Sequence, residues 1–222
     1  MGTTIKLTAS DGHAFDAYRA DPEGTAKAGL VVVQEIFGVN SHIREVCDGF
    51  AAEGYAALAP ALFDRAERGV ELGYEADEVA RGREIRGQVS WDDAVLDVET
   101  AARELASLPK VGVVGYCWGG SMAWLGACRL GFNCAVGYYG GQIIGFVEER
   151  PSCPTMLHFG ETDATIPLDD VEVIGATHPG VPIHVYDGAG HGFNCDRRGS
   201  YHADAAATAR QRTLAFMADY LG

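Results

Sequence analysis

Residues 111–121, VGVVGYCWGGS, decide the fold of this chain. The stretch opens with a β-branched apolar run, which is typical of a buried strand. Cys117 follows, flanked by Gly115 and Gly119, and the apolar residues after it predict a helix. A reactive side chain at a sharp strand-to-helix turn defines a nucleophile elbow, usually G-x-S-x-G. Here cysteine stands in the place of serine.

The residues around Cys117 favour a reactive thiol. Side chains at Gly115 and Gly119 would collide where the strand and the helix pass each other. The helix after Cys117 directs its free N–H groups and positive dipole end at the sulfur, which favours the thiolate. Cysteine is more often an inert, buried residue, and that interpretation is preferred for Cys47, Cys128, Cys134 and Cys153.

Composition limits the classes of protein to consider. The chain has 222 residues, a 47% hydrophobic content and a formal net charge of −14. This length fits a single domain with a sizeable core, and the acidity argues against non-specific binding to nucleic acid or anionic membrane. No apolar run approaches the ~20 residues that span a bilayer. Six cysteines without a C-x-x-C pair, behind a start (MGTTIKL) that does not resemble a signal peptide, predict free thiols in the cytoplasm.

Strands alternate with helices along the chain, after a hairpin at Asp11-Gly12. The predicted strands are 4–9, 14–20, 28–34, 55–59, the run from 111, 135–139, 155–159 and 183–186. The predicted helices begin at Asn40 or Ser41, at the Ser90 cap, after Cys117, at 168 and at 203, and Gly54 and Pro109 end the first two. This order predicts a doubly wound, mostly parallel α/β sheet of about eight strands with helices on both faces. Residues 1–222 form one domain in this interpretation, and residues 61–89 are an insertion of short helices and loops near the site.

Four polar residues each follow a predicted strand: Glu35, Cys117, Asp163 and His191. The carboxyl ends of parallel strands meet at one edge of a sheet, where ligands bind. We therefore expect these four side chains to gather there.

Three of these residues have the order of a catalytic triad. A thiol nucleophile needs a base, and the base needs a group that fixes its tautomer. Cys117, Asp163 and His191 follow the nucleophile–acid–histidine order of α/β-hydrolases. Asp169 and Asp170 are the alternative for the acid, although they suit the first turn of a helix.

The segments QEIFGVN, GYCWGG, the Asp163 loop and DGAGHGF resemble the dienelactone hydrolases, or carboxymethylenebutenolidases, which are cysteine-dependent enzymes of the α/β-hydrolase fold. The resemblance implies hydrolysis of esters or lactones through a thioacyl enzyme, without metal or organic cofactor. It makes Cys117 the nucleophile, His191 the base and Asp163 its partner. Glu35 then matches a buried glutamate that contacts the resting thiol and helps to ionise it when substrate binds. The backbone N–H groups of Ile36 and Trp118 form the oxyanion hole, as the elbow geometry also suggests.

The chain departs from the family at one position. Well-known members hold the carboxylate of dienelactone with arginines, and one of these lies four residues after the catalytic histidine. Cys195 occupies that position here. The candidate replacements are Arg197, Arg198, Arg81 and Arg83. A broader range of esters, including activated esters and phosphoesters, therefore stays open.

Two other classes of function compete with a cysteine hydrolase. A thiol sensor or ligand-binding protein on the same fold would not need the oriented base that Asp163 and His191 provide. A metal-dependent hydrolase ranks last, because the sequence lacks H-x-x-x-H and H-E-x-x-H spacing. The expected partner is a small ester or lactone, with no nucleic acid or membrane, and the protein is expected to be a monomer or a small homo-oligomer.

Overall fold

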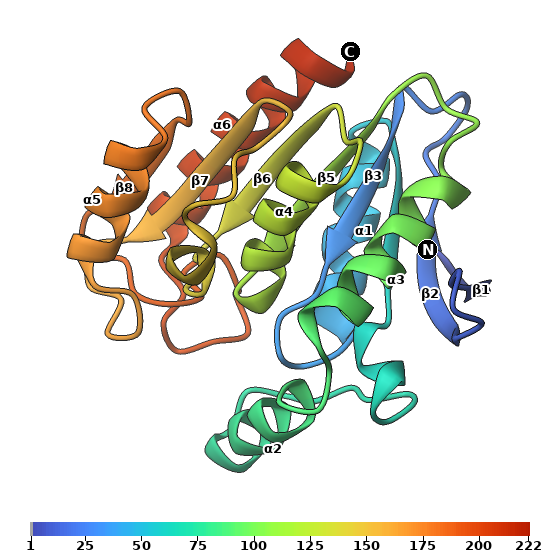
Figure 1. Ribbon diagram of the computed structural model, residues 1–222, viewed down its shortest axis with the longest axis horizontal. Helices are drawn as coiled ribbons and strands as arrows, with labels where there is room; N and C mark the ends of the chain where they lie inside the picture. Colours follow the sequence, from blue (N-terminus) through green and yellow to red (C-terminus); the bar gives the residue numbers. More distant parts are fainter. Residues whose placement is uncertain (1) are drawn as a thin grey trace. The chain divides into compact units, whose positions relative to one another are not determined.

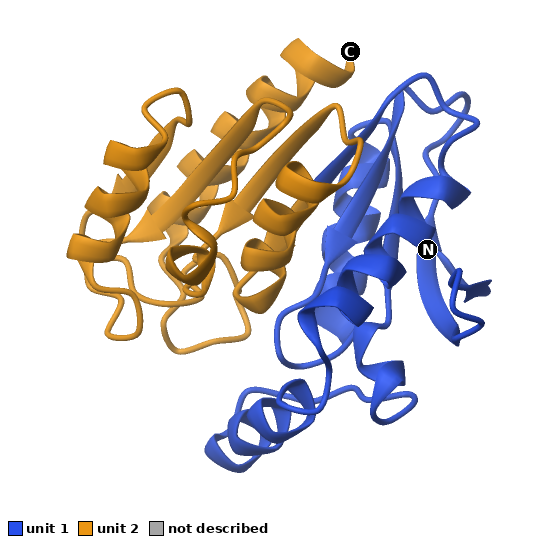
Figure 2. Ribbon diagram, viewed as in Figure 1, with its two compact units in different colours: residues 1–113 blue, residues 114–222 orange. Residues whose placement is uncertain are grey.

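A computed structural model describes residues 2–222 (Figure 1). Contacts divide the chain into two compact units, residues 1–113 and 114–222 (Figure 2). Across the described residues there are eight strands and six α-helices. The elements of the first unit are β1 (Thr3–Thr8), β2 (Ala14–Ala20), β3 (Ala28–Val33), α1 (Ser41–Ala52), β4 (Tyr55–Pro60), the 3-10 helix η1 (Leu62–Arg65), α2 (Ala76–Arg86) and α3 (Trp91–Glu104).

Strand β5 (Val111–Tyr116) begins in the last residues of the first unit and leads into the second. The second unit continues with α4 (Trp118–Arg129), β6 (Cys134–Tyr138), the 3-10 helix η2 (Ile143–Phe146), β7 (Thr155–Gly160), α5 (Leu168–Thr177), β8 (Ile183–Tyr186) and α6 (Ala203–Leu221).

The strands follow the predicted mostly parallel arrangement. In the first unit their order is β1-β2-β4-β3, with β1–β2 and β2–β4 antiparallel and β3–β4 parallel. In the second unit the order is β5-β6-β7-β8, and the pairs β6–β7 and β7–β8 are parallel. Every residue of β3 and β4 is buried, as expected for parallel strands that are covered on both faces. The α/β fold class predicted from the alternating pattern is confirmed.

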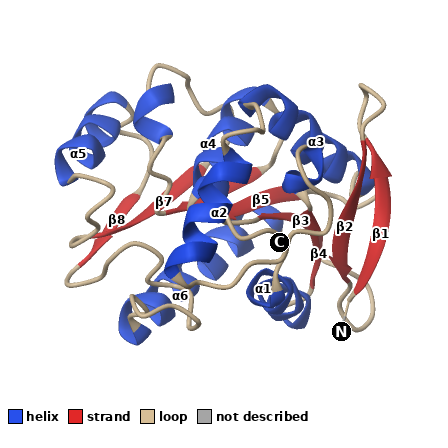
Figure 3. Ribbon diagram, turned by 90° about the horizontal axis from the view of Figure 1, so that it is seen from below, coloured by secondary structure: helices blue, strands red, loops and turns tan. Residues whose placement is uncertain are grey.

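Helices lie on both faces of the strands within each unit (Figure 3). In the first unit α1 and α3 cover opposite faces, and in the second unit α4 and α5 lie opposite α6. The Asn40 side chain accepts a hydrogen bond from the Ile43 N–H and so caps α1, one of the two predicted caps. No helix within residues 2–222 is both long enough and apolar enough to cross a bilayer.

The end of one helix differs from its predicted position. Helix α3 ends at Glu104, well before Pro109, because the chain tightens there into i→i+3 hydrogen bonds such as Leu108 N to Leu105 O. At the end of α6, Tyr220 is 39% exposed and Leu221 is buried. Leu221 lies one turn after the buried Met217 and therefore continues the same face.

A buried ion pair holds the hairpin and α3 together in the first unit. Arg65 donates from Nε and Nη2 to the two carboxylate oxygens of Asp97, at 2.9 and 2.6 Å. The Asp97 side chain has no exposed area, and that of Arg65 is 10% exposed. Arg65 also contacts Asp11 of the hairpin at 2.5 Å. Burial raises the pKa of Asp97, and the Arg65 guanidinium offsets part of that effect.

A second buried polar group joins α6 to the strands of the second unit. His158 on β7 contacts the Tyr186 hydroxyl through Nδ1 at 2.9 Å and the Thr213 hydroxyl through Nε2 at 3.1 Å. Tyr138 contacts the same Thr213 hydroxyl at 2.6 Å. Burial lowers the pKa of His158 well below its ordinary value, and the nearby His184 and Arg212 add to the effect. The imidazole is therefore neutral in the folded protein at neutral pH.

Candidate active site

The turn between β5 and α4 has the geometry of a nucleophile elbow. Cys117 adopts φ 56° and ψ −117°, a conformation that non-glycine residues rarely occupy. Its N–H donates to the Tyr138 carbonyl at 3.0 Å, which holds the strained residue in place. A Cβ atom at Gly115 would lie 1.8 Å from the Gly119 carbonyl oxygen, and one at Gly120 would lie 2.3 Å from that of Tyr138. Only glycine allows the strand and the helix to approach so closely.

The Cys117 side chain is half-buried at the N-terminus of a twelve-residue helix. Trp118 is the first residue of α4, so its backbone N–H belongs to the positive end of the helix beside the sulfur. This is the position that the elbow pattern predicts for an oxyanion donor.

Cys117, His191 and Asp163 form a continuous chain of contacts within the second unit. The Cys117 Sγ lies 3.1 Å from His191 Nε2. On the other side of the ring, His191 Nδ1 lies 2.7 Å from Asp163 Oδ2. The carboxylate can only accept, so Nδ1 carries the proton that it donates to Asp163. The structure thus brings together the three residues that the sequence nominated as a triad.

Two loops position the acid and the base. Asp163 follows β7 and His191 follows β8, and Thr162 joins the two loops by donating from N and Oγ1 to the Ala189 carbonyl at 2.9 and 3.0 Å. A Cβ atom at Gly160 would lie 2.4 Å from that carbonyl oxygen, so glycine is needed where the loops meet.

The electrostatics of the site favour a charged imidazole. Burial alone lowers the pKa of His191, but a negative charge on the neighbouring Cys117 sulfur and the hydrogen bond to Asp163 outweigh burial and raise it to about 10. Burial likewise raises the pKa of Asp163, but hydrogen bonds from His191 and Thr165 outweigh it and lower the net value. The carboxylate is therefore ionised at neutral pH, and the imidazolium is stabilised between two groups that can carry negative charge.

The remaining cysteines differ from Cys117 in their surroundings. All six are free thiols, as expected. Burial raises the pKa of Cys47, Cys128 and Cys153, that of Cys128 to about 12. Thiols of this kind stay protonated and unreactive at neutral pH, which agrees with the inert role expected for them.

The structure also reveals two neighbours of the triad that the sequence analysis missed. Thr165 donates through its hydroxyl to Asp163 Oδ1 at 2.7 Å. The Tyr139 ring stands edge-on to the His191 ring with their centroids 5.2 Å apart, on a backbone with φ 38°. The Asp-x-Thr spacing is a sequence signal for the first contact, because a side chain of this type bonds two residues onward. The left-handed conformation of Tyr139 has no local sequence signal.

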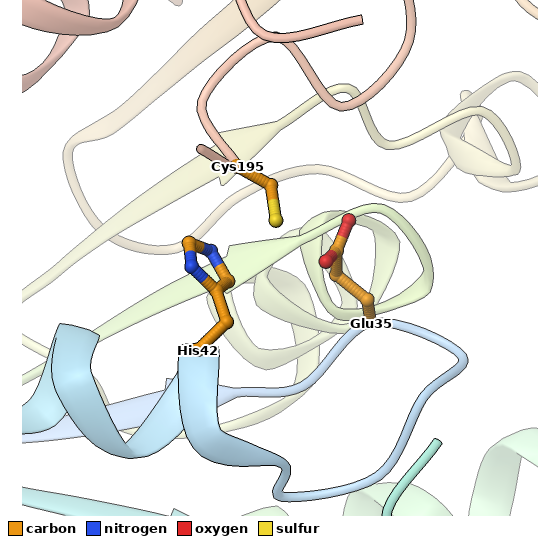
Figure 4. A group of neighbouring side chains, drawn as sticks. All are labelled: Glu35, His42 and Cys195. Atoms are coloured by element: carbon orange, nitrogen blue, oxygen red, sulfur yellow. The ribbon is translucent and has the colours of Figure 1, made fainter. Parts of the chain in front are cut away.

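Glu35 and Ile36 belong to the first unit and follow β3. The Gln34 side chain donates to the Glu35 carbonyl at 3.2 Å and accepts from the Leu62 N–H at 3.2 Å, which fixes this loop. Glu35 is buried, and its carboxylate and the imidazole of the buried His42 on α1 lie within 4.8 Å of each other (Figure 4). Cys195, also labelled there, is a buried residue of the second unit.

The four candidate arginines have different surroundings. Arg81 pairs with Glu67 and Glu84 on and near α2, whereas Arg83 is exposed. Arg197 is exposed. The Arg198 guanidinium lies against Gly192, where an added Cβ atom would come within 2.4 Å of its Nη1. Of the four, Arg198 lies beside the residue that follows the base.

Comparison with known proteins gives the family. The model of the dienelactone hydrolase family matches residues 15–221. The chain belongs to the dienelactone hydrolase family. It is 35% identical to the carboxymethylenebutenolidase of Pseudomonas putida, covering 96% of this chain and 95% of that protein. A Synechocystis protein assigned as a carboxymethylenebutenolidase is 34% identical over 95% of this chain and 94% of its own length.

A solved structure extends the comparison to three dimensions. The crystal structure of a Klebsiella pneumoniae protein assigned as a dienelactone hydrolase matches with a TM-score of 0.87 and 30% identity, covering 99% of this chain and 100% of that chain. The predicted family and α/β-hydrolase fold are thus confirmed, and the protein is a dienelactone hydrolase-like hydrolase of ester or lactone bonds.

Proposed function

We propose that this member of the family hydrolyses its ester or lactone through Cys117 and a thioacyl-enzyme intermediate. The observation that carries the proposal is the pair of contacts on one imidazole, 3.1 Å from His191 Nε2 to the Cys117 sulfur and 2.7 Å from Nδ1 to Asp163. A sulfur nucleophile, a base and an oriented acid are the three parts that covalent acyl transfer needs.

The first half of the reaction forms the thioester. The Cys117 thiolate attacks the carbonyl carbon of the substrate, and the electron pair of the C=O bond moves onto its oxygen. In this proposal the N–H groups of Trp118 and Ile36 donate to that oxyanion. As the C=O bond re-forms, the C–O bond of the ester breaks, and the leaving oxygen takes the proton from His191 Nε2. With a lactone, the leaving hydroxyl stays attached to the acyl group.

The second half releases the acid. His191 is then neutral. It takes a proton from a water molecule while the oxygen of that water attacks the thioester carbon. The tetrahedral oxyanion collapses, the C–S bond breaks, and the electron pair returns to Cys117 as thiolate. His191 ends protonated beside the thiolate, as it was when the thiolate attacked the substrate. His191 Nδ1 keeps its proton throughout and donates it to Asp163, whose carboxylate stabilises the imidazolium.

Glu35 has a proposed activating role toward Cys117, which rests on the match to the family's buried glutamate. The match of the family model to residues of both units supports the proposal that residues 1–222 act as one hydrolase domain. The proposal also places the protein in the cytoplasm, with its cysteines as free thiols, and makes it a monomer or a small homo-oligomer.

The substrate range follows from the charge near the base. Cys195 offers no charge where family members carry arginine, which favours neutral esters and other activated esters, including phosphoesters, over dienelactone itself. Arg198, against Gly192, is the candidate that would bind a substrate carboxylate if one is present. Arg197, Arg81 and Arg83 have less support for this role.

The test is hydrolysis of 4-nitrophenyl acetate by wild type and Cys117→Ala, each with and without prior iodoacetamide. We expect wild type to be active and to lose activity on alkylation, and Cys117→Ala to fold but not turn over. Cys153→Ala is the matched control, since its thiol has a raised pKa, and it should keep both the activity and the sensitivity to iodoacetamide. Activity of Cys117→Ala within about tenfold of wild type would contradict the mechanism. An inert wild type would favour the thiol-sensor alternative.

A further inference from the structure

We propose that Thr165 is a positioning residue for the triad, whose hydroxyl fixes the Asp163 carboxylate and the His191 ring in one arrangement. The inference rests on the proposed function for its effect on catalysis. Thr165 lies two positions after Asp163. Neither the elbow pattern, the triad order nor the family match assigns a role to Thr165.

The two oxygens of the Asp163 carboxylate have separate partners. Oδ1 accepts from the Thr165 backbone N–H at 2.8 Å and from the Thr165 hydroxyl at 2.7 Å. Oδ2 accepts from His191 Nδ1 at 2.7 Å. Any residue except proline could make the backbone bond of this Asx turn at position 165, but the Thr165 hydroxyl adds a second donor. Rotation of the carboxylate would break both bonds to Oδ1, so Oδ2 stays directed at His191.

The same hydroxyl faces the base. The Thr165 Oγ1 lies 3.2 Å from His191 Nδ1. A hydroxyl has one proton and two lone pairs. Its proton goes to Asp163 Oδ1, so the lone pairs on the other side are available to the Nδ1–H. The ring proton is then directed between Asp163 Oδ2 and Thr165 Oγ1, which holds the tautomer with Nε2 directed at Cys117.

Thr165 bonds the buried carboxylate from a position at the surface. The Asp163 side chain has no exposed area, whereas Thr165 is an exposed residue. Replacing the hydroxyl by a methyl group of similar size would remove a donor and still keep water out. A smaller side chain would remove the donor but admit a water molecule that can replace it. Position 165 therefore distinguishes a hydrogen-bonding role from a space-filling one.

The experiment compares Thr165→Ser, Thr165→Ala and Thr165→Val by kcat and KM with 4-nitrophenyl acetate. We expect kcat within about twofold of wild type for Ser, about threefold lower for Ala and about tenfold lower for Val, with KM unchanged in all three. A space-filling role predicts the reverse order, because valine matches threonine in shape. Thr177→Val is the matched control, since its hydroxyl donates to the Val173 carbonyl on α5, and it should behave as wild type.

A second readout does not depend on turnover. The His191 Nδ1 proton, held between two oxygens, should give a far-downfield proton NMR resonance, present in wild type and Thr165→Ser but shifted upfield or broadened in Thr165→Val. A Val variant equal to wild type in kcat and in this resonance would overturn the proposal, as would a Ser variant as impaired as Val. If wild type does not hydrolyse the ester, the proposed function fails, and the resonance in the three variants still decides the role of Thr165.

Discussion

Replacing Cys117 by serine should lower the pKa of His191. In wild type the sulfur lies 3.1 Å from His191 Nε2. In the proposed mechanism this sulfur is a thiolate, and a negative charge there is the main influence that raises the pKa of the imidazole to about 10. A serine hydroxyl is similar in shape but carries no charge at the same pH. The substitution therefore removes the charge while the hydrogen-bonding geometry to Asp163 is retained.

Coulomb's law gives the size of the effect. Two unit charges at the 3.1 Å separation interact by about 1.3 kcal/mol in water and by about 5 kcal/mol at an effective dielectric constant of ~20. One pKa unit corresponds to about 1.4 kcal/mol. We therefore expect the pKa of His191 to fall by between about 1 and 4 units in Cys117→Ser.

The assay is an NMR titration of the His191 ring in protein with isotope-labelled histidine, from neutral to alkaline pH. Wild type should titrate near pH 10 and Cys117→Ser well below it. Cys153→Ser is the control and should leave the His191 titration unchanged. Two results would refute the reasoning: a wild-type His191 pKa near the ordinary value of 6.5, or the same pKa in wild type and Cys117→Ser.

Three further predictions concern buried charged and titratable groups. Asp97→Asn should lower the free energy of unfolding by about 3 kcal/mol, because it leaves Arg65 largely buried without its main partner; urea denaturation measures this, and a loss below about 1 kcal/mol would contradict it. The folded protein keeps His158 neutral, whereas the unfolded chain gains a proton as pH falls through about 6.5. Stability should accordingly be lost with falling pH more steeply in wild type than in His158→Gln, and equal slopes would exclude His158 as the cause. Glu35→Gln should change the pH dependence of Cys117 alkylation by iodoacetamide, and an identical profile would remove Glu35 from the proposed mechanism.

The juxtaposition of Cys117, His191 and Asp163 could be predicted from the sequence because each of the three follows a strand. Short loops at the carboxyl ends of neighbouring strands leave little freedom in where these residues lie. The glycines around Cys117 also indicated in the sequence that the strand and the helix pass closely. The structure agrees, because a Cβ atom at Gly115 would lie 1.8 Å from the Gly119 carbonyl oxygen. The strand-helix alternation likewise predicted the sheet class, because buried strands and amphipathic helices have distinct periods.

The contacts of Thr165 and Tyr139 could not be predicted in the same way. The Asp-x-Thr spacing indicates the turn at Asp163, but the approach of the Thr165 hydroxyl to His191 depends on how the loops after β7 and β8 come together. Tyr139 adopts a left-handed conformation, although the next residue, Gly140, would adopt it more easily. The Tyr139 N–H donates to the His158 carbonyl at 2.7 Å, which holds Tyr139 in place. At the end of α6, Tyr220 and Leu221 are both apolar enough for the core, and only packing selects Leu221.

The most direct test of the central claim is the mass of the enzyme during turnover. Wild type mixed with 4-nitrophenyl acetate and quenched in acid should carry one acetyl group, and peptide mapping should locate it on Cys117. His191→Gln should form little adduct or retain it longer, because the water that attacks the thioester then has no base. Acetyl on Cys117 that forms and decays at the rate of turnover is the result the mechanism predicts. Turnover without an adduct at Cys117, or with the acyl group on another residue, would contradict it.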